Sequence, residues 1–285
     1  MNTPTTKPEF SRRSQLFLEE MGLGPIWVPR DAGADTASPL PAGARSFHDA
    51  ADETDAVMKS QANAPDFFAD DAADLVAAAD THYAAQAIMS MQWPSLKETV
   101  AGCVKCSLCK GRTNTVFGTG DENAEWLFIG EGPGRNEDLQ GDPFVGQAGK
   151  LLDNMLVELG VKRGSNAYIA NVVKCRPTDQ TGRDRPPTTE EASACLPYLQ
   201  RQIELIKPKV LVALGKTAAI SLLGLDANTP VGKLRGTVHR YGDLPLIVTY
   251  HPAYLLRKLT EKGKVWSDLC LAMSVQASDA QRPPG

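Results

Sequence analysis

The sequence predicts an α/β protein, a three-layer α/β/α sandwich with a central, four-stranded, mostly parallel sheet. Four short apolar runs, expected as strands, alternate with segments whose apolar residues recur at helical spacing. This alternation is typical of a parallel sheet covered on both faces. A glycine-rich turn at residues 130–134 follows the first run. Open α/β sheets bind ligands at such turns, beyond the carboxyl ends of their strands.

Two segments precede the predicted domain. Residues 1–30 hold a short apolar island that is too small to bury itself, so we expect it to dock on the main domain or on a partner. Residues 31–92 are rich in Ala, Asp and Pro, with eleven acidic and two basic residues, and are expected to be a disordered linker. The whole chain carries −4, so the remainder is net positive, which suits a polyanion-binding domain. With neither a signal peptide nor a membrane-length apolar run, we expect a cytoplasmic protein.

The folded domain is expected over residues 93–276, followed by a disordered tail at 277–285. Ser95 and Glu98 form a capping-box pattern, which predicts that a helix begins there. Strands are expected at 126–129, 167–173, 210–214 and 246–249. Helices are expected at 149–159, 189–206, 217–223 and 265–275.

Two glycine motifs do not fit nucleotide-binding loops. In the turn that begins at Gly130, the third glycine of a dinucleotide fingerprint would fall on Arg135. The Gly-Lys-Thr triplet at 215–217 resembles the end of a phosphate loop, but the first glycine of that loop would fall on Val210, within an expected strand. The sequence therefore supports neither NAD nor ATP.

Cysteine spacing predicts a metal centre. Cys103 and Cys106 have two residues between them, so both thiolates can reach one metal, and Cys175 and Cys195 supply two more. The spacing alone does not separate tetrahedral zinc from an iron–sulfur cluster. Cys109 extends the run to C-x-x-C-x-x-C without the fourth cysteine of a ferredoxin motif. Cys270 is expected to be a buried apolar residue of the last helix.

From about residue 93 to 275 the sequence resembles family 4 uracil-DNA glycosylases, the iron–sulfur branch of that superfamily. The resemblance rests on motifs that occur in the family's order: GRT at 111–113, VFG at 116–118, GEGPG at 130–134, PFVG at 143–146, NVVKCRP at 171–177, LG at 214–215 and HPAYLLR at 251–257. It implies an enzyme that flips uracil out of double- or single-stranded DNA and hydrolyses its N-glycosidic bond, which starts base excision repair. It also implies a four-stranded parallel sheet between helices, and we expect a monomer.

The same resemblance implies a [4Fe–4S] cluster held by Cys103, Cys106, Cys175 and Cys195, with Cys109 outside the ligand set. The cluster is expected to shape a DNA-facing loop rather than to transfer electrons. Separately, residues 11–30 resemble the N-terminal peptide of the psi subunit of the bacterial replicative clamp loader. That similarity implies a replication protein as a partner.

Residue types at the strand ends indicate how the base is held. Cleavage leaves negative charge on uracil, chiefly at O2, and His251 is expected to donate a hydrogen bond to that atom. Phe144 is expected to stack on the flipped base. The Asn171 amide can accept from N3–H and donate to O4, whereas cytosine has the opposite polarity at both positions.

Other motif residues are expected around the pocket. Glu131 and Gly132 are expected to line it and to help place the attacking water, and Glu137 is expected beside the substrate. The superfamily's better-known branch has a catalytic aspartate at the position of Gly132, so the chemistry here relies less on a general base. An apolar wedge must fill the gap that the flipped nucleotide leaves.

The wedge is expected to be Leu255 or Leu256, with Arg257 contacting a phosphate. One departure from the family pattern is Asp184, where the family usually has Asn, in a longer loop at 178–185. A carboxylate there could orient water but would repel phosphate. Two other functions compete with excision of uracil: a non-catalytic iron–sulfur or zinc DNA-binding module, and a redox carrier that uses Cys103, Cys106 and Cys109.

Overall fold

The structure is a computed structural model and describes residues 86–279. The N-terminal peptide, most of the linker and the end of the tail lie outside the described residues. Residues 86–89 are helical, and Ile88 is 2% exposed within a hydrophobic cluster. The packed region therefore begins before residue 93. Among the described residues, no helix is long and apolar enough to cross a membrane.

A mixed sheet of seven strands forms the middle layer, in the order β1-β4-β2-β5-β7-β6 with β3 also paired to β4. The strands are β1 (Thr119–Gly120), β2 (Trp126–Gly130), β3 (Lys162–Arg163), β4 (Asn166–Asn171), β5 (Val210–Leu214), β6 (Val238–Tyr241) and β7 (Leu244–Thr249). The central strands β4, β2, β5 and β7 are mutually parallel. The four expected strands are these four. The sequence missed β1, β3 and β6 at the two edges.

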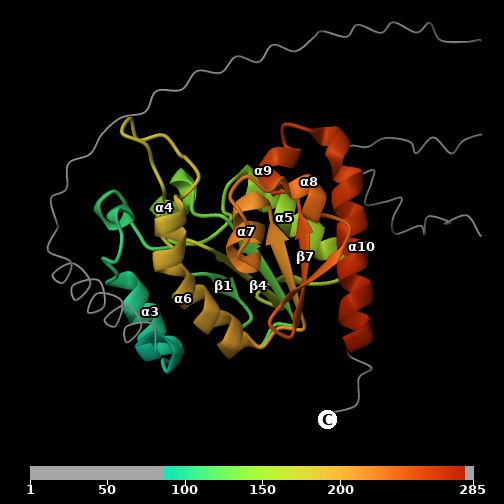
Figure 1. The fold of residues 1–285 in the computed structure, drawn as a ribbon, viewed down its shortest axis with the longest axis horizontal. Helices are drawn as coiled ribbons and strands as arrows, with labels where there is room; N and C mark the ends of the chain where they lie inside the picture. The colour runs from blue at the N-terminus through green and yellow to red at the C-terminus, as the bar shows by residue number, and fades with distance from the viewer. Residues whose placement is uncertain (1–85, 280–285) are drawn as a thin grey trace, which may run out of the picture.

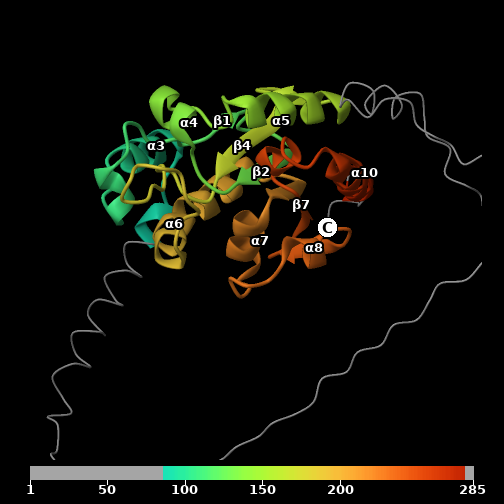
Figure 2. The same ribbon diagram turned by 90° about the horizontal axis from the view of Figure 1, so that it is seen from above.

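Helices cover both faces of this sheet. They are α3 (Trp93–Ala101), α4 (Arg135–Gln140), α5 (Gln147–Glu158), α6 (Thr189–Ile206), α7 (Lys216–Leu223), α8 (Val231–Leu234), α9 (Pro252–Leu255) and α10 (Lys262–Asp279), with the short 3₁₀ helices η1 (Ser107–Lys110) and η2 (Leu259–Glu261). Figures 1 and 2 show α5 and α10 on one face and α3, α6 and α7 on the other. The predicted α/β fold is confirmed.

Alternating side chains of the central strands form two cores. In β2, Trp126 and Phe128 pack in the cluster beneath α5 and α10, whereas Leu127 and Ile129 pack in the cluster beneath α3, α6 and α7. Successive strand residues point to opposite faces, so a strand that is buried on both sides must be apolar throughout. All five residues of β2 and of β5 are buried.

The predicted capping box at Ser95 is wrong. Helix α3 begins two residues earlier, with Gln92 as its N-cap and Pro94 in its first turn, where the fixed φ of proline favours a helix start. The capping box occurs instead at α6. There the Thr188 hydroxyl accepts from the Glu191 N–H at 3.2 Å, and the Glu191 carboxylate accepts from the Thr188 N–H at 2.8 Å.

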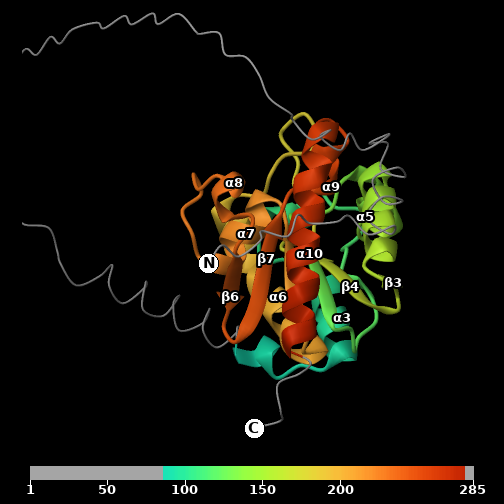
Figure 3. The ribbon, with the colours of Figure 1, turned by 90° about the vertical axis from the view of Figure 1, so that its right-hand side faces the viewer.

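Helix α10 runs along β7 (Figure 3) and fixes the end of that strand. The Thr249 hydroxyl, at the last residue of β7, donates to the buried carboxylate of Asp268 on α10 at 2.6 Å. Arg235 donates to the same carboxylate at 2.7 and 2.8 Å. The direction in which the chain leaves β7 is therefore set by a buried, charge-assisted network.

Candidate active site

A pocket of about 520 Å³ opens at the edge of the sheet where β2, β4 and β7 end. The segments that follow these strands, the loop before α5 and the loop between β4 and α6 all contribute to its walls. The lining residues are Glu131, Gly132, Pro133, Gly134, Glu137, Phe144, Ala148, Asn171, Pro177, Asp184, Arg185, Pro186, His251, Ala253, Tyr254 and Arg257. The glycine-rich turn thus lies at a ligand pocket, where the sequence predicted one.

Asn171 presents an unpaired amide oxygen at this pocket. It is the last residue of β4, opposite Gly130 of β2, and is 2% exposed. Its Oδ1 atom has no hydrogen-bond partner among the described residues. An unpaired buried acceptor costs about 1–3 kcal/mol, so its position indicates a ligand donor. A Cβ on Gly130 would lie 2.4 Å from this oxygen, so the approach of the two strands requires glycine.

Phe144 is held in an uncommon backbone conformation, with φ at 55°. Glu137 Oε1 accepts from the N–H groups of Val145 and Gly146 at 3.0 and 3.1 Å. Arg163 donates to the Phe144 carbonyl at 2.9 Å. These contacts fix the aromatic ring at the pocket. They also show that Glu137 stabilises the loop that carries Phe144, a role that the sequence did not reveal.

His251 is the N-cap of α9, and its ring is neutral at physiological pH. Burial lowers the pKa of the ring from 6.5 to about 4. The nearby charge of Arg257 contributes to this lower pKa, and Glu137 opposes it. The Nδ1 atom accepts from the Ala253 N–H at 3.1 Å, so the single ring proton resides on Nε2. The ring stacks against Phe144 with centroids 5.4 Å apart.

Glu131 is oriented by Thr217, a residue of the Gly-Lys-Thr triplet at 215–217. Thr217, in the first turn of α7, donates to Glu131 Oε2 at 2.8 Å. Burial raises the pKa of the Glu131 carboxyl, and the hydrogen bond from Thr217 partly offsets this. A Cβ on the neighbouring Gly132 would lie 2.6 Å from Val173 Cγ2, so the backbone here packs directly on the core. The Gly-Lys-Thr triplet is not a phosphate loop, but its threonine fixes the orientation of a carboxylate that lines the pocket.

The two candidate wedges differ in exposure. Leu255 is fully buried in the cluster beneath α5 and α10, so its prediction as a wedge is wrong. Leu256 is 45% exposed, and Arg257 is exposed at the pocket. A one-turn helix turns successive side chains by about 100°, so one leucine packs inward and the next points out.

Asp184 reaches the pocket wall already paired. Arg176 Nε donates to its Oδ1 atom at 2.6 Å, and Arg176 also donates to the Gly182 carbonyl at 3.1 Å. The loop thereby neutralises the carboxylate that would otherwise repel a phosphate. The sequence showed both residues but not that they pair.

A second, smaller pocket gathers five cysteines: Cys103, Cys106, Cys109, Cys175 and Cys195. Arg112 Nη1 donates to the Cys175 sulfur at 3.3 Å, and the backbone N–H of Lys174 donates to the Cys195 sulfur at 3.3 Å. Burial raises the pKa values of the Cys106 and Cys175 thiols, and that of Cys195 to about 12.

Two further observations qualify the cysteine predictions. Within residues 86–279, no three His, Cys, Asp or Glu side chains are grouped as a single metal ion would require. Cys270 is exposed on α10, so the expectation that it is buried is wrong. The sequence did not reveal that Cys270 lies on the solvent-facing side of α10.

A model of the uracil DNA glycosylase superfamily matches residues 117–270, more than half of the chain. The α/β fold, with a ligand pocket at the carboxyl edge of its sheet, therefore defines an enzyme of this superfamily.

The relatives identify the branch. A type-4 uracil-DNA glycosylase from Archaeoglobus fulgidus is 46% identical over 176 residues, which are 59% of this chain and 85% of that protein. A type-4 enzyme from Thermotoga maritima is 45% identical over 163 residues, 57% of this chain and 82% of that protein. A type-5 enzyme from Pyrobaculum aerophilum is 29% identical over 150 residues, 48% and 64% of the two chains. This chain belongs to the type-4 uracil-DNA glycosylases, and the predicted enzyme class and DNA repair function are confirmed.

Proposed function

We propose that the enzyme flips uracil out of DNA into the 520 Å³ pocket and hydrolyses its N-glycosidic bond there, starting base excision repair. The observation that carries this proposal is the unpaired amide oxygen of Asn171 at a pocket that also holds a neutral histidine. Such an oxygen needs a donor, and N3–H of uracil is one.

Asn171 selects uracil over cytosine. Its Oδ1 atom accepts from N3–H, and its amide nitrogen donates to O4. Cytosine has no proton on N3 and an amino group in place of O4. The Asn171 oxygen would therefore face another acceptor, and its amide nitrogen would face another donor. A site built to pair polar groups can reject the wrong partner by about 10⁴-fold or more, because the buried polar groups are left unpaired.

His251 stabilises the leaving base as a neutral donor. Its Nε2–H group donates to uracil O2, where negative charge develops as the bond breaks. Phe144 lies against the histidine ring and stacks on the base, a contact worth about 1–3 kcal/mol. A positive charge on the ring is not required, because a preorganised neutral dipole in a buried site already favours the developing anion.

Glu131 and the backbone at Gly132 place the attacking water. Thr217 holds one carboxylate oxygen, which leaves the other oxygen to orient a water molecule toward the sugar. Leu256 fills the gap in the base stack, and Arg257 contacts a phosphate beside the flipped nucleotide.

Cys103, Cys106, Cys175 and Cys195 hold a [4Fe–4S] cluster. Their side chains come from three segments and line one pocket, and two of the sulfurs accept hydrogen bonds, which favour negatively charged sulfur. When bound, the cluster supplies a covalent cross-link between the cysteine loop and α6. Visible absorbance with iron and sulfide content tests this assignment, and a zinc-only protein would refute it.

Excision is tested with a uracil-containing oligonucleotide, by scoring strand cleavage at the abasic site. We expect cleavage by the wild-type protein, no cleavage of the matched cytosine oligonucleotide, and loss of activity in His251→Ala. A non-catalytic DNA-binding module would show the same activity before and after this substitution. Absence of product with iron-loaded protein would disprove the proposal.

The enzyme acts as a cytoplasmic monomer, and residues 11–30 bind a replication protein. This proposal is supported by sequence pattern alone, since that peptide lies outside the described residues. Deletion of residues 1–30 should leave excision intact and abolish capture of the partner. Equal capture by the full-length and shortened proteins would contradict it.

A further inference from the structure

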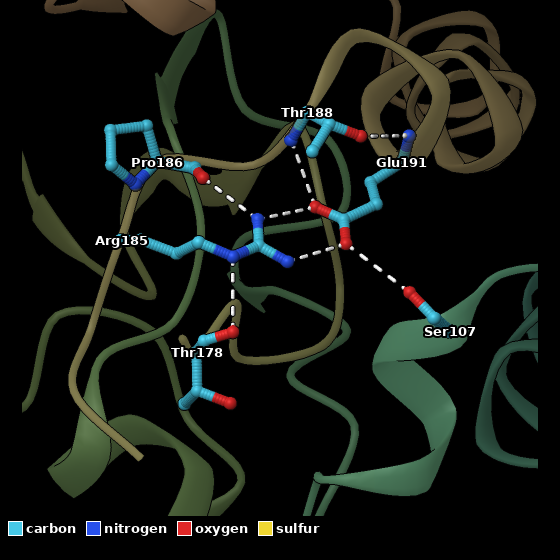
Figure 4. A network of polar contacts seen from close by, with 6 residues as sticks. All are labelled: Ser107, Thr178, Arg185, Pro186, Thr188 and Glu191. Atoms are coloured by element: carbon cyan, nitrogen blue, oxygen red, sulfur yellow. Dashed lines mark hydrogen bonds and ion pairs between the residues drawn. The ribbon is translucent and has the colours of Figure 1, made fainter. Parts of the chain in front are cut away.

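One carboxylate, that of Glu191, contacts both Ser107, next to Cys106, and Arg185 at the wall of the base pocket (Figure 4). Glu191, at the start of α6, is 5% exposed and accepts from Arg185 through both of its oxygens at 2.7 Å. It also accepts from the Thr188 N–H at 2.8 Å and from the Ser107 hydroxyl at 3.3 Å. Glu191 therefore joins the loop just before α6 to Ser107, which is 84 residues away in sequence.

The Arg185 guanidinium donates its hydrogen bonds to groups of the protein itself. Besides the two bonds to Glu191, its Nε atom donates to the Thr178 carbonyl at 3.0 Å and its Nη1 atom donates to the Pro186 carbonyl at 2.9 Å. These bonds hold the two ends of the loop at 178–185, within the connection between β4 and α6. Asp184, Arg185 and Pro186 of that loop form one wall of the base pocket. Arg185 is therefore suited to fix the wall rather than to bind substrate.

The other end of the network reaches the cysteines. Ser107 lies in η1, directly after Cys106 and two residues before Cys109. Cys195 lies on α6 four residues after Glu191, one helical turn further along. The loop and the helix that carry these cysteines are thus the two elements that Glu191 ties to the pocket wall.

We propose that Arg185 and Glu191 are positioning residues that hold the wall formed by residues 184–186 in place against the cysteine loop, with Ser107 as the connection to that loop. The inference rests on the proposed base pocket and cluster site. It gives the cysteine loop a part in substrate binding: when the loop moves, the wall of the base pocket moves with it. A bidentate pair suits this task because its planar geometry fixes direction as well as distance.

Two substitutions separate the parts of the network. Glu191→Gln keeps the volume of the side chain and the capping box with Thr188, since glutamine also serves at that position, but it removes the charge that holds Arg185. Ser107→Ala removes the link to the cysteine loop alone. Glu122→Gln is the matched control, because Glu122, between β1 and β2, forms an exposed ion pair with Lys97 of α3. The readouts are the maximal single-turnover rate, the enzyme concentration at half-maximal rate, and iron per chain.

We expect Glu191→Gln to raise the half-saturating concentration about tenfold and Ser107→Ala about threefold, with maximal rates within about twofold of wild type and full iron content. The double variant should resemble Glu191→Gln, because both changes interrupt one chain of contacts. Effects that multiply to about thirtyfold would refute the coupling. A fall in maximal rate with unchanged half-saturation, or iron loss that accompanies weaker binding, would also overturn the assignment. Failure of the proposed function would appear separately, as a wild-type enzyme that cleaves no uracil oligonucleotide.

Discussion

Replacement of His251 by alanine should slow uracil excision about 10²–10³-fold, which corresponds to about 3–4 kcal/mol of transition-state stabilisation. The magnitude follows from the state of the ring. Because burial lowers the pKa of the ring to about 4, the ring is neutral at pH 7. Because Nδ1 accepts from Ala253, the neutral ring has its single N–H on Nε2. The alanine variant therefore lacks one preorganised neutral donor.

The assay is the single-turnover excision rate measured from about pH 5 to about pH 9. A neutral donor predicts a rate that shows no titration attributable to His251 within this range. The contrary result is a wild-type rate that falls as the pH rises through an apparent pKa between about 6 and 7.5, while the rate of His251→Ala shows no such step. That result would mean that the protonated imidazolium is the active form, and it would refute the reasoning. His239→Gln is the control, because this β6 histidine bonds the Leu234 carbonyl and is absent from the pocket lining.

The same histidine affects stability with a defined sign. Its pKa is lower in the folded protein than in the unfolded chain, so the unfolded chain binds more protons between about pH 6.5 and about pH 4. Folded-state stability from this group is therefore present above about pH 6.5 and is lost as the pH falls through that window. Thermal melting of the wild type should decline more than that of His251→Ala between about pH 7 and about pH 5.

Three further predictions concern packing and the cysteines. Gly130→Ala would place a methyl group 2.4 Å from the Asn171 amide oxygen, so we expect roughly 1–3 kcal/mol of destabilisation in urea unfolding and about 100-fold slower excision. Leu255→Ala should cost about 2–5 kcal/mol in the same unfolding measurement, whereas Leu256→Ala should cost less than about 0.5 kcal/mol and slow excision from duplex more than from single-stranded DNA; equal unfolding effects would contradict this. Cys270→Ser should leave iron content and visible absorbance unchanged, since its side chain is exposed on α10.

Long apolar patterns made the main elements predictable from sequence. The expected helix at 189–206 has the observed bounds of α6, and the expected strands match the cores of β2, β5 and β7. Strands β1 and β3 have two residues each, and helices α8 and α9 have four. Elements this short have no recognisable repeat of apolar residues, because contacts with the rest of the fold determine them.

The pocket residues that directly follow a strand could be predicted from the sequence, because their residue types indicate their function. Asn171 and His251 follow apolar runs, and the topology of a parallel sheet brings such ends together. The sequence could not show that Thr217 orients Glu131, because the two residues are 86 positions apart and meet only through the packing of α7. Pairing within the loop at 178–185 was hidden for the same reason.

Close backbone packing at Gly130 and Gly132 has a consequence for how this enzyme can evolve. A Cβ on Gly130 would overlap the Asn171 amide, so this position cannot change without rebuilding its neighbours, whereas a Cβ on Gly132 would meet the end of the Val173 side chain. New base preferences must therefore arise elsewhere in the pocket. The exposed loop that carries Asp184 also lines the pocket, and exposed loops tolerate sequence change better than the elements they connect. Lineages of this enzyme should diverge in substrate range by changing that loop while the glycine turn stays the same.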